Sequence, residues 1–126
     1  MVHEEAFPSA ARVRRPVEFD RVFSARLTAA GNGLVLHAAP SDRVPPVARL
    51  GMSVSRRVGT AVIRARWKRR LREAFRRIRT RLPAADYVVV VKARDVPRGA
   101  AGARLVEETL ESLARRVTAR RGFGRE

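Results

Sequence analysis

The chain lacks cysteine entirely and has only two histidines, His3 and His37, among its 126 residues. Without cysteine, a disulfide scaffold is excluded, and so is every metal site that needs a thiolate ligand. The two histidines are too few and too far apart in the sequence to form an imidazole cluster, so a zinc finger is excluded too. We therefore expect no disulfide, no zinc and no other cofactor bound by the protein alone.

Long apolar runs are missing as well. No stretch of 18 apolar residues occurs, so we expect no membrane-spanning helix. His3, Glu4 and Glu5 stand near the N-terminus, where a secretory signal needs basic and then apolar residues. These two observations predict a cytoplasmic protein with no membrane partner.

Acidic residues are scarce, because 12 Asp and Glu stand against 28 Lys and Arg, which gives a formal net charge of +16. The acids are dispersed, and His37 is isolated from any Ser/His/Asp arrangement. We therefore predict that no protein side chain is catalytic. A positive charge of this size exceeds what solubility requires and indicates a nucleic acid or an anionic membrane as partner. Of these two we favour nucleic acid.

The length and the hydrophobic content of 45% fit a single domain with one modest core. Residues 1–11 mix charge, proline and alanine without periodicity, so we expect a flexible leader there. Residues 12–122 then form the domain, and residues 123–126 form a C-terminal tail.

Apolar spacing predicts the first elements of this domain. Residues 16–24 have the pattern of a short amphipathic helix, with a proline at its first position. Residues 29–33 carry turn chemistry, and residues 34–39 read as a strand that a proline ends. Residues 47–55 alternate apolar and polar side chains, which is typical of a half-buried strand. We expect these two strands to pair as a hairpin.

A long helix follows from about residue 60 to residue 82, where Pro83 stops it. Residues 86–92 are a continuous apolar run rich in β-branched side chains, which predicts an interior strand. Residues 95–102 read as a loop, and a final helix closes near Gly122. The sequence thus predicts an α+β fold with the order helix, two or three strands, helix, strand, helix. We take three strands before the long helix, which gives α-β-β-β-α-β-α and a small mixed sheet of about four strands packed against helices.

The long helix carries the strongest functional signal. Ten positive side chains between Arg64 and Arg81 stand against one acid, Glu73. Its large apolar residues fall within an arc of about 120° at 100° per residue, so the helix is predicted to dock against a core. The cations then share the other side, where their repulsion is unfavourable unless phosphates neutralise it. The apolar residues are Ile63, Trp67, Leu71, Ala74, Phe75, Ile78 and Leu82.

Phe19 and Phe23 lie four residues apart on the first predicted helix. This spacing is typical of core packing, and core is the default interpretation. The alternative is an aromatic platform on which unpaired bases stack, with Arg21 and His37 close by. The residues alone leave both interpretations open.

The run LGMSVSRRVGTAVIRARWKRRLREAFR, residues 50–76, is similar to the signature of the bacterial ribonuclease P protein family, approximately LG(L)SVSKKVGNAVxRNRxKRxxRExFR. The basic residues 12–15 and the segment EFDRVF, residues 18–23, also resemble the first helix of that family. The resemblance implies a fold like domain 2 of ribosomal protein S5, with an unusual left-handed βαβ crossover around the basic helix.

The resemblance also implies a function. Members assist a catalytic RNA in the endonucleolytic removal of the 5′ leader from precursor tRNA, and the RNA carries out the catalysis with Mg²⁺ that it holds itself. By position, the residues that match the contacts to catalytic RNA are Arg56, Arg57, Arg64, Arg66, Lys68, Arg69, Arg72 and Arg76. The residues that match the leader-binding cleft are Arg12, Arg15, Phe19, Phe23 and His37.

Four positions depart from the family pattern. Ala65 replaces the usual Asn between two arginines, so the hydrogen bonds of that amide are missing. Thr60 replaces another Asn and remains a competent helix cap, and Trp67 replaces an aliphatic residue. His37 stands where some relatives carry an aromatic residue.

Three other functions compete with this interpretation. A ribosomal protein or a general RNA chaperone shares small size and basicity. A nuclease that works without RNA is disfavoured because the carboxylates are not clustered in the sequence. A helix on a membrane surface would need its apolar arc exposed to lipid.

Overall fold

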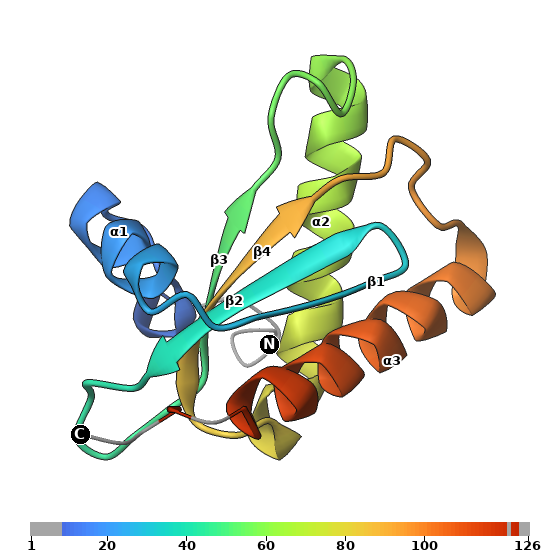
Figure 1. The fold of residues 1–126 in the computed structure, drawn as a ribbon. Coiled ribbons are helices and arrows are strands. Elements are labelled where there is room, and N and C mark those ends of the chain that lie inside the picture. Colours follow the sequence, from blue (N-terminus) through green and yellow to red (C-terminus); the bar gives the residue numbers. More distant parts are fainter. Residues whose placement is uncertain (1–8, 121, 124–126) are drawn as a thin grey trace.

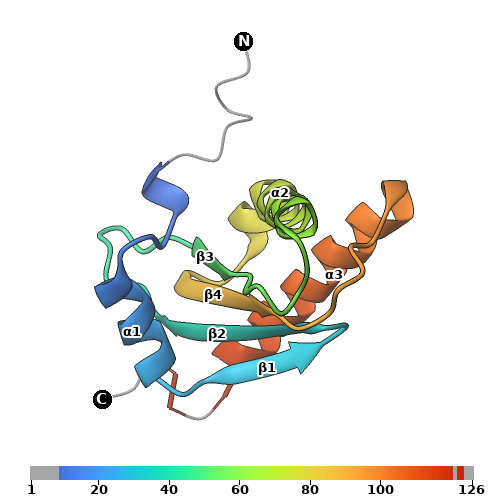
Figure 2. The same cartoon turned by 90° about the horizontal axis from the view of Figure 1, so that it is seen from above.

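The computed structural model describes residues 9–120 and 122–123. One four-stranded sheet carries helices on both faces (Figures 1 and 2). Helix α1 (Pro16–Ser24) lies on one face, and helices α2 (Ala61–Ile78) and α3 (Gly99–Thr118) cover the other. The predicted α+β class is confirmed, and α1 has the predicted bounds.

The strands are β1 (Thr28–Gly31), β2 (Leu34–Pro40), β3 (Arg49–Ser53) and β4 (Ala85–Val91), and their order in the sheet is β1-β2-β4-β3. The pairs β1–β2 and β2–β4 are antiparallel, whereas β3–β4 is parallel. The chain order is therefore the predicted α-β-β-β-α-β-α. Strand β1 occupies residues that were predicted to form a turn, because the turn is confined to Asn32 and Gly33.

The predicted hairpin between β2 and β3 is wrong, because β4 lies between these two strands. All but one of the seven residues of β4 are buried, so this strand gains most from neighbours on both edges and cover on both faces. The interior position of β4 is confirmed.

Strands β3 and β4 are adjacent and parallel, and α2 connects them. The views in Figures 1 and 2 together show that this crossover is left-handed, as the resemblance implies and against the usual hand. Helix α2 passes at Ile78 into a 3₁₀ turn (Arg79–Arg81), so its α-helical part is shorter than predicted. Helix α3 starts at Gly99, inside the segment predicted to be a loop.

The main core lies between the sheet and the pair α2 and α3. Trp67 and Phe75 are each only 1% exposed, and Leu71 and Ile78 are fully buried, so the apolar stripe of α2 is docked as predicted. A smaller cluster under α1 includes Val22 and Val88. Within residues 9–120, none of the helices has the length and apolar content that a membrane crossing needs.

The packed domain extends beyond its predicted ends. Residues 1–8 of the predicted leader and residues 124–126 of the predicted tail lie outside the described residues. Ala11, the last residue of the predicted leader, is fully buried in the main core. Phe123 also packs against that core, so packing reaches past residues 12–122 at both ends.

Candidate nucleic-acid interface

Helix α1 is fixed at its N-terminus by Glu18. One oxygen of this carboxylate, Oε1, accepts hydrogen bonds from the backbone N–H groups of Arg14 and Arg15, at 3.0 and 3.2 Å. These bonds favour the charged carboxylate and lower the pKa of Glu18 to about 2, the bond from Arg14 being the largest cause. Pro16 is the first residue of the helix, a position whose N–H has no hydrogen-bond partner within the helix, so its absence in proline has no cost.

A buried ion network then ties α1 to the sheet. Asp86 of β4 has no exposure, and Arg49 of β3, 3% exposed, donates two hydrogen bonds of 2.7 Å to its carboxylate. Arg21 of α1 donates to the same carboxylate. Arg49 also pairs with Glu18, at 3.3 Å between Nη1 and Oε2. The bonds to Asp86 raise the pKa of Arg49, so it stays charged.

This network was not among the features predicted from the sequence. A signal exists, since one charged residue of each sign stands in the two predicted strands, Arg49 in residues 47–55 and Asp86 at the start of residues 86–92. Two opposite charges inside two buried strands can be buried only if they meet. Their pairing predicts that the two strands are neighbours, which would have corrected the hairpin.

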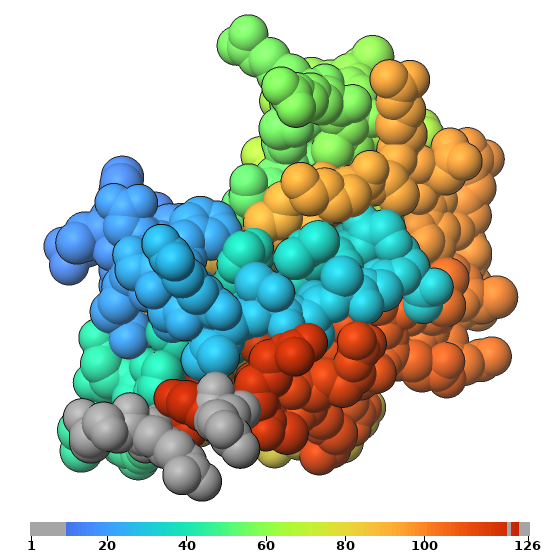
Figure 3. Space-filling model, in the orientation of Figure 1, coloured from blue at the N-terminus to red at the C-terminus, as the bar shows by residue number. Residues whose placement is uncertain are grey.

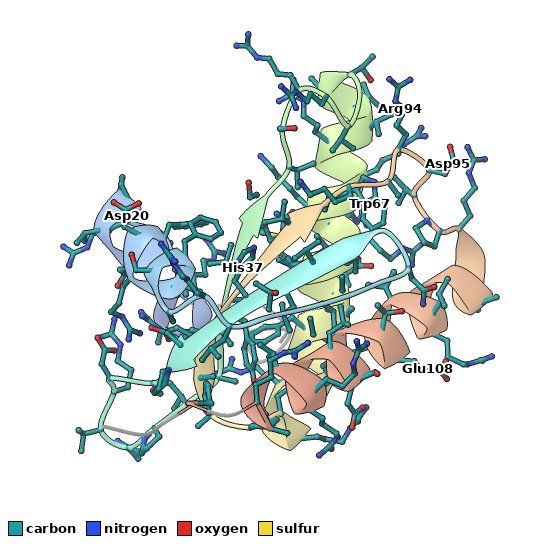
Figure 4. The ribbon with its side chains drawn as sticks, in the orientation of Figure 1. Asp20, His37, Trp67, Arg94, Asp95 and Glu108 are labelled. Carbon is teal, nitrogen blue, oxygen red and sulfur yellow. The ribbon has the colours of Figure 1, made fainter. Side chains whose placement is uncertain are left out.

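The aromatic side chains of α1 rest on the open face of the sheet. The ring centroids of Phe19 and Phe23 are 6.3 Å apart, and the ring of Phe23 meets that of His37 on β2 edge-on, with centroids 4.8 Å apart. His37, Val88 and Gly51 lie side by side across the sheet, and Phe19 covers Gly51. The structure thus brings together three of the five residues matched to the leader cleft; Figure 4 shows His37 beside α1.

Each phenylalanine fits one of the two interpretations, Phe19 that of a packed residue and Phe23 that of an accessible ring. Phe19 is half-buried and packs in the small cluster under α1, whereas Phe23 is 37% exposed. Burial lowers the pKa of His37, and Lys92 lowers it further, so this imidazole is neutral at pH 7. The surface beside α1 is therefore an uncharged aromatic strip.

A groove of about 500 Å³ lies between Phe19, one member of this aromatic strip, and the basic helix. Its walls include Arg12 and Phe19 on one side, Gly51 of β3 at the floor, and Lys68 and Arg72 of α2 on the other side. We call it the leader groove. Figure 3 shows the recess between α1, in blue, and the segment from β3 into α2, in green.

Arg15, the remaining residue matched to the cleft, lies elsewhere. It lines a second hollow of about 440 Å³ at the N-terminal end of α1, together with Arg12, Arg14 and Arg43. This hollow shares Arg12 and Arg14 with the leader groove. A basic surface therefore continues around the start of α1.

The cations of α2 differ in their partners. Arg66, Lys68 and Arg69 are exposed, whereas Arg64, Arg72 and Arg76 are half-buried. Near the end of the helix, carboxylates of α3 pair with Arg77 and Arg81, at 3.5 and 3.1 Å. Arg69 pairs with Glu73 at 3.3 Å on the surface, where such pairs contribute little. Most of the matched cations thus face solvent, and Arg56 and Arg57 do so in the turn before α2.

The acids near this surface are engaged by arginines. Asp86 and Glu18 already accept hydrogen bonds from guanidinium groups. Among the described residues, His, Cys, Asp and Glu side chains do not gather in groups of three or more.

Comparison with known proteins identifies the family. The family model described as Ribonuclease P matches residues 7–118. The chain belongs to the ribonuclease P protein family. It is 40% identical over 122 residues to the ribonuclease P protein component of Mycolicibacterium gilvum, a match that covers 91% of this chain and 96% of that protein. It is 41% identical over 91 residues to the component of Bordetella avium, covering 71% and 76%.

Two solved ribonuclease P proteins share the fold. That of Staphylococcus aureus has a TM-score of 0.66 at 25% identity and covers 85% of this chain and 94% of its own. That of Thermotoga maritima has a TM-score of 0.67 at 26% identity, covering 84% and 96%. Membership in the ribonuclease P family gives the chain a role in tRNA 5′ processing, as part of an endoribonuclease whose RNA is its partner.

Proposed function

We propose that the protein binds the ribonuclease P RNA through the cations of α2 and holds the unpaired 5′ leader of precursor tRNA in the leader groove. The observation that carries this proposal is the groove itself, in which Phe19 of α1 and the cations Lys68 and Arg72 of α2 line one hollow. Single-stranded nucleic acid is bound by this combination, because cations follow the phosphates and aromatic rings stack on bases.

Phe23 does not line the groove, but it lies next to Phe19, it is exposed, and its ring meets that of His37 edge-on, so it is the side chain best placed to stack on a base that leaves the groove. A stacked base contributes about 1–3 kcal/mol to binding. Phe19 supports the floor, since it packs over Gly51 and under α1. The buried pairs of Asp86 with Arg21 and Arg49 hold α1 at a fixed distance from the sheet, so the groove is preformed.

The RNA subunit, in this proposal, carries out the cleavage. The acids nearest the groove accept hydrogen bonds from guanidinium groups, which leaves them poorly suited as bases or as metal ligands. Any Mg²⁺ in the assembled particle is accordingly held by RNA. The protein contributes affinity for the leader and neutralises phosphate charge, which lets the particle work at lower magnesium.

Phe23→Ala tests the leader contact. The particle reconstituted with ribonuclease P RNA should bind leader-bearing tRNA more tightly than mature tRNA. The variant should shrink that preference by roughly five- to tenfold, which corresponds to the low end of what one stacked base contributes. Equilibrium binding to the two tRNAs gives the measurement. Val17→Ala, on the same helix at a 65% exposed position, is the matched control and should keep the preference.

An unchanged preference in Phe23→Ala would contradict the leader contact. If the particle with the unsubstituted protein shows no preference at all between the two tRNAs, a ribosomal protein or a general RNA chaperone becomes the better assignment.

A further inference from the structure

A second cationic groove lies on the other side of α2. It has a volume of about 830 Å³ and is formed by α2 and by the connection between β4 and α3, with Gly99 at the start of α3. Figure 4 shows Arg94 and Asp95 on this connection, on the far side of α2 from α1. Five arginines line the groove, namely Arg66, Arg69, Arg70, Arg94 and Arg98.

The charge of this groove is not balanced from within. Two acids, Glu73 and Asp95, line it beside the five arginines, and Glu73 is already paired with Arg69. In the described part of the chain, no carboxylate forms an ion pair with Arg66, Arg70, Arg94 or Arg98. Like charges that face each other across a hollow repel, and phosphate groups relieve that repulsion.

The wall opposite α2 is held in place by two contacts. The indole N–H of Trp67 donates a hydrogen bond of 3.0 Å to the carbonyl oxygen of Ala93, which fixes the start of the connection to α2. At the other end, a methyl group on Gly102 would lie 2.4 Å from the carbonyl carbon of Pro97, so α3 packs directly against this segment. The groove is therefore preformed, which lowers the cost of binding.

The two grooves lie on opposite flanks of α2. At 100° per residue, Lys68 and Arg72 of the leader groove lie about 100–140° from the buried Trp67 in one direction, and Arg66 and Arg70 lie about 60–100° in the other. Arg69 lies near the outward crest between them. An α-helix with its side chains is about 10–12 Å across, so one strand cannot occupy both flanks at the same level.

We propose that a phosphate backbone segment of folded RNA binds in the groove between α2 and the β4–α3 connection, so that two RNA segments straddle α2. Arg94 and Arg98 are the contacts that the basic helix alone does not supply. This inference rests on the proposed function, because it takes the ribonuclease P RNA as the source of the second segment.

Arg94→Gln/Arg98→Gln tests the second groove. Because both residues are exposed, the variant keeps the fold, which thermal unfolding checks. Log affinity for the ribonuclease P RNA decreases with log salt, and we expect the magnitude of this negative slope to be smaller by about 1.4–1.8 in the variant. Binding at 0.1 M salt should weaken roughly 30-fold. Arg104→Gln/Arg116→Gln, on the exposed side of α3, removes the same charge and should change the slope little.

An unchanged slope in Arg94→Gln/Arg98→Gln would contradict RNA binding in the second groove, and so would an equally large change of slope in the control pair. Either result leaves the proposed function standing. Absence of RNA binding by the unsubstituted protein overturns both. A short single-stranded leader oligonucleotide should bind the variant and the unsubstituted protein alike, because it occupies the leader groove alone.

The straddling itself can be tested because the chain contains no cysteine. Asp95→Cys places one thiol in the second groove, and Ala61→Cys, about 120° from Trp67, places one on the flank that carries Lys68 and Arg72. An iron chelate on each thiol generates hydroxyl radicals locally. We expect the two probes to cleave different segments of the RNA. Cleavage of one shared segment, or none from position 95, overturns the straddled arrangement.

Discussion

Asp86 shows at the level of one residue how the interface is held. Its carboxylate has no exposure and accepts hydrogen bonds from guanidinium groups on β3 and α1. A buried pair of this kind contributes little net stability compared with apolar packing, but breaking it leaves an uncompensated buried charge. The role of Asp86 is to position α1, because its ion pair with Arg21 fixes this helix against the sheet.

Asp86→Asn should therefore lower the free energy of unfolding by about 3–5 kcal/mol, since the buried guanidinium of Arg49 loses its nearer counter-charge and keeps only the longer pair with Glu18. Urea unfolding followed by circular dichroism measures the change. Asp95→Asn, at an exposed site, should change the same quantity by less than about 0.5 kcal/mol. Equal effects of the two substitutions would show that the buried pair has no special weight.

His37 provides a second test at this scale. Burial lowers its pKa in the folded protein below the ordinary 6.5, so between these two values the unfolded chain binds more protons. Stability should therefore fall as the pH drops below about 6.5. Melting temperatures between pH 7.5 and 5.5 measure this, in a window where Glu18, with its pKa near 2, does not titrate. His37→Gln should flatten the dependence; an NMR titration midpoint above 6.5 would contradict it.

At the scale of elements, local patterns were enough for the helices but not for the sheet. The docking of α2 follows from its own periodicity, since Trp67 and Phe75 recur on one stripe. The neighbour of β3 could not be predicted in this way, because strand alternation is the same whichever strand lies alongside. The pairing of Arg49 with Asp86 spans 37 positions, and only a non-local argument recovers it. The second groove could not be predicted from local patterns for the same reason, since its walls come from two segments that are distant in the sequence.

The exposed face of α2 makes a prediction about RNA binding. Replacing Arg64, Arg66 and Arg69 with Gln should reduce the magnitude of the negative slope of log affinity against log salt. The reduction should be roughly 0.7–0.9 for each phosphate that the variant no longer neutralises. Affinities for the ribonuclease P RNA measured between about 0.05 and 0.5 M salt give the slope. A matched triple variant of Arg77, Arg81 and Arg115 should have a smaller effect, because carboxylates of α3 already pair with these side chains. An unchanged slope in the first variant would exclude Arg64, Arg66 and Arg69 as RNA contacts.

For the whole molecule, the proposed function separates charge from chemistry, because the protein neutralises phosphates and its RNA partner carries out the cleavage. The net charge of +16 suits it to gather phosphates, while its buried acids are held by arginines. We predict that the purified protein alone does not cleave precursor tRNA, whereas protein with ribonuclease P RNA cleaves it at magnesium concentrations at which the RNA alone is slow. Gel analysis of the 5′ product under both conditions measures this. Cleavage by RNA-free protein would overturn the division of labour.

The bare backbone at Gly51 has a consequence for selectivity. A methyl group there would come within 2.8 Å of the Phe19 ring and 3.0 Å of the Val13 carbonyl oxygen, so only hydrogen lets both settle onto β3. The floor of the groove at this position is consequently bare backbone against which the Phe19 ring packs. In the proposed function, a leader nucleotide above this position meets no side chain of residue 51 that could distinguish one base from another.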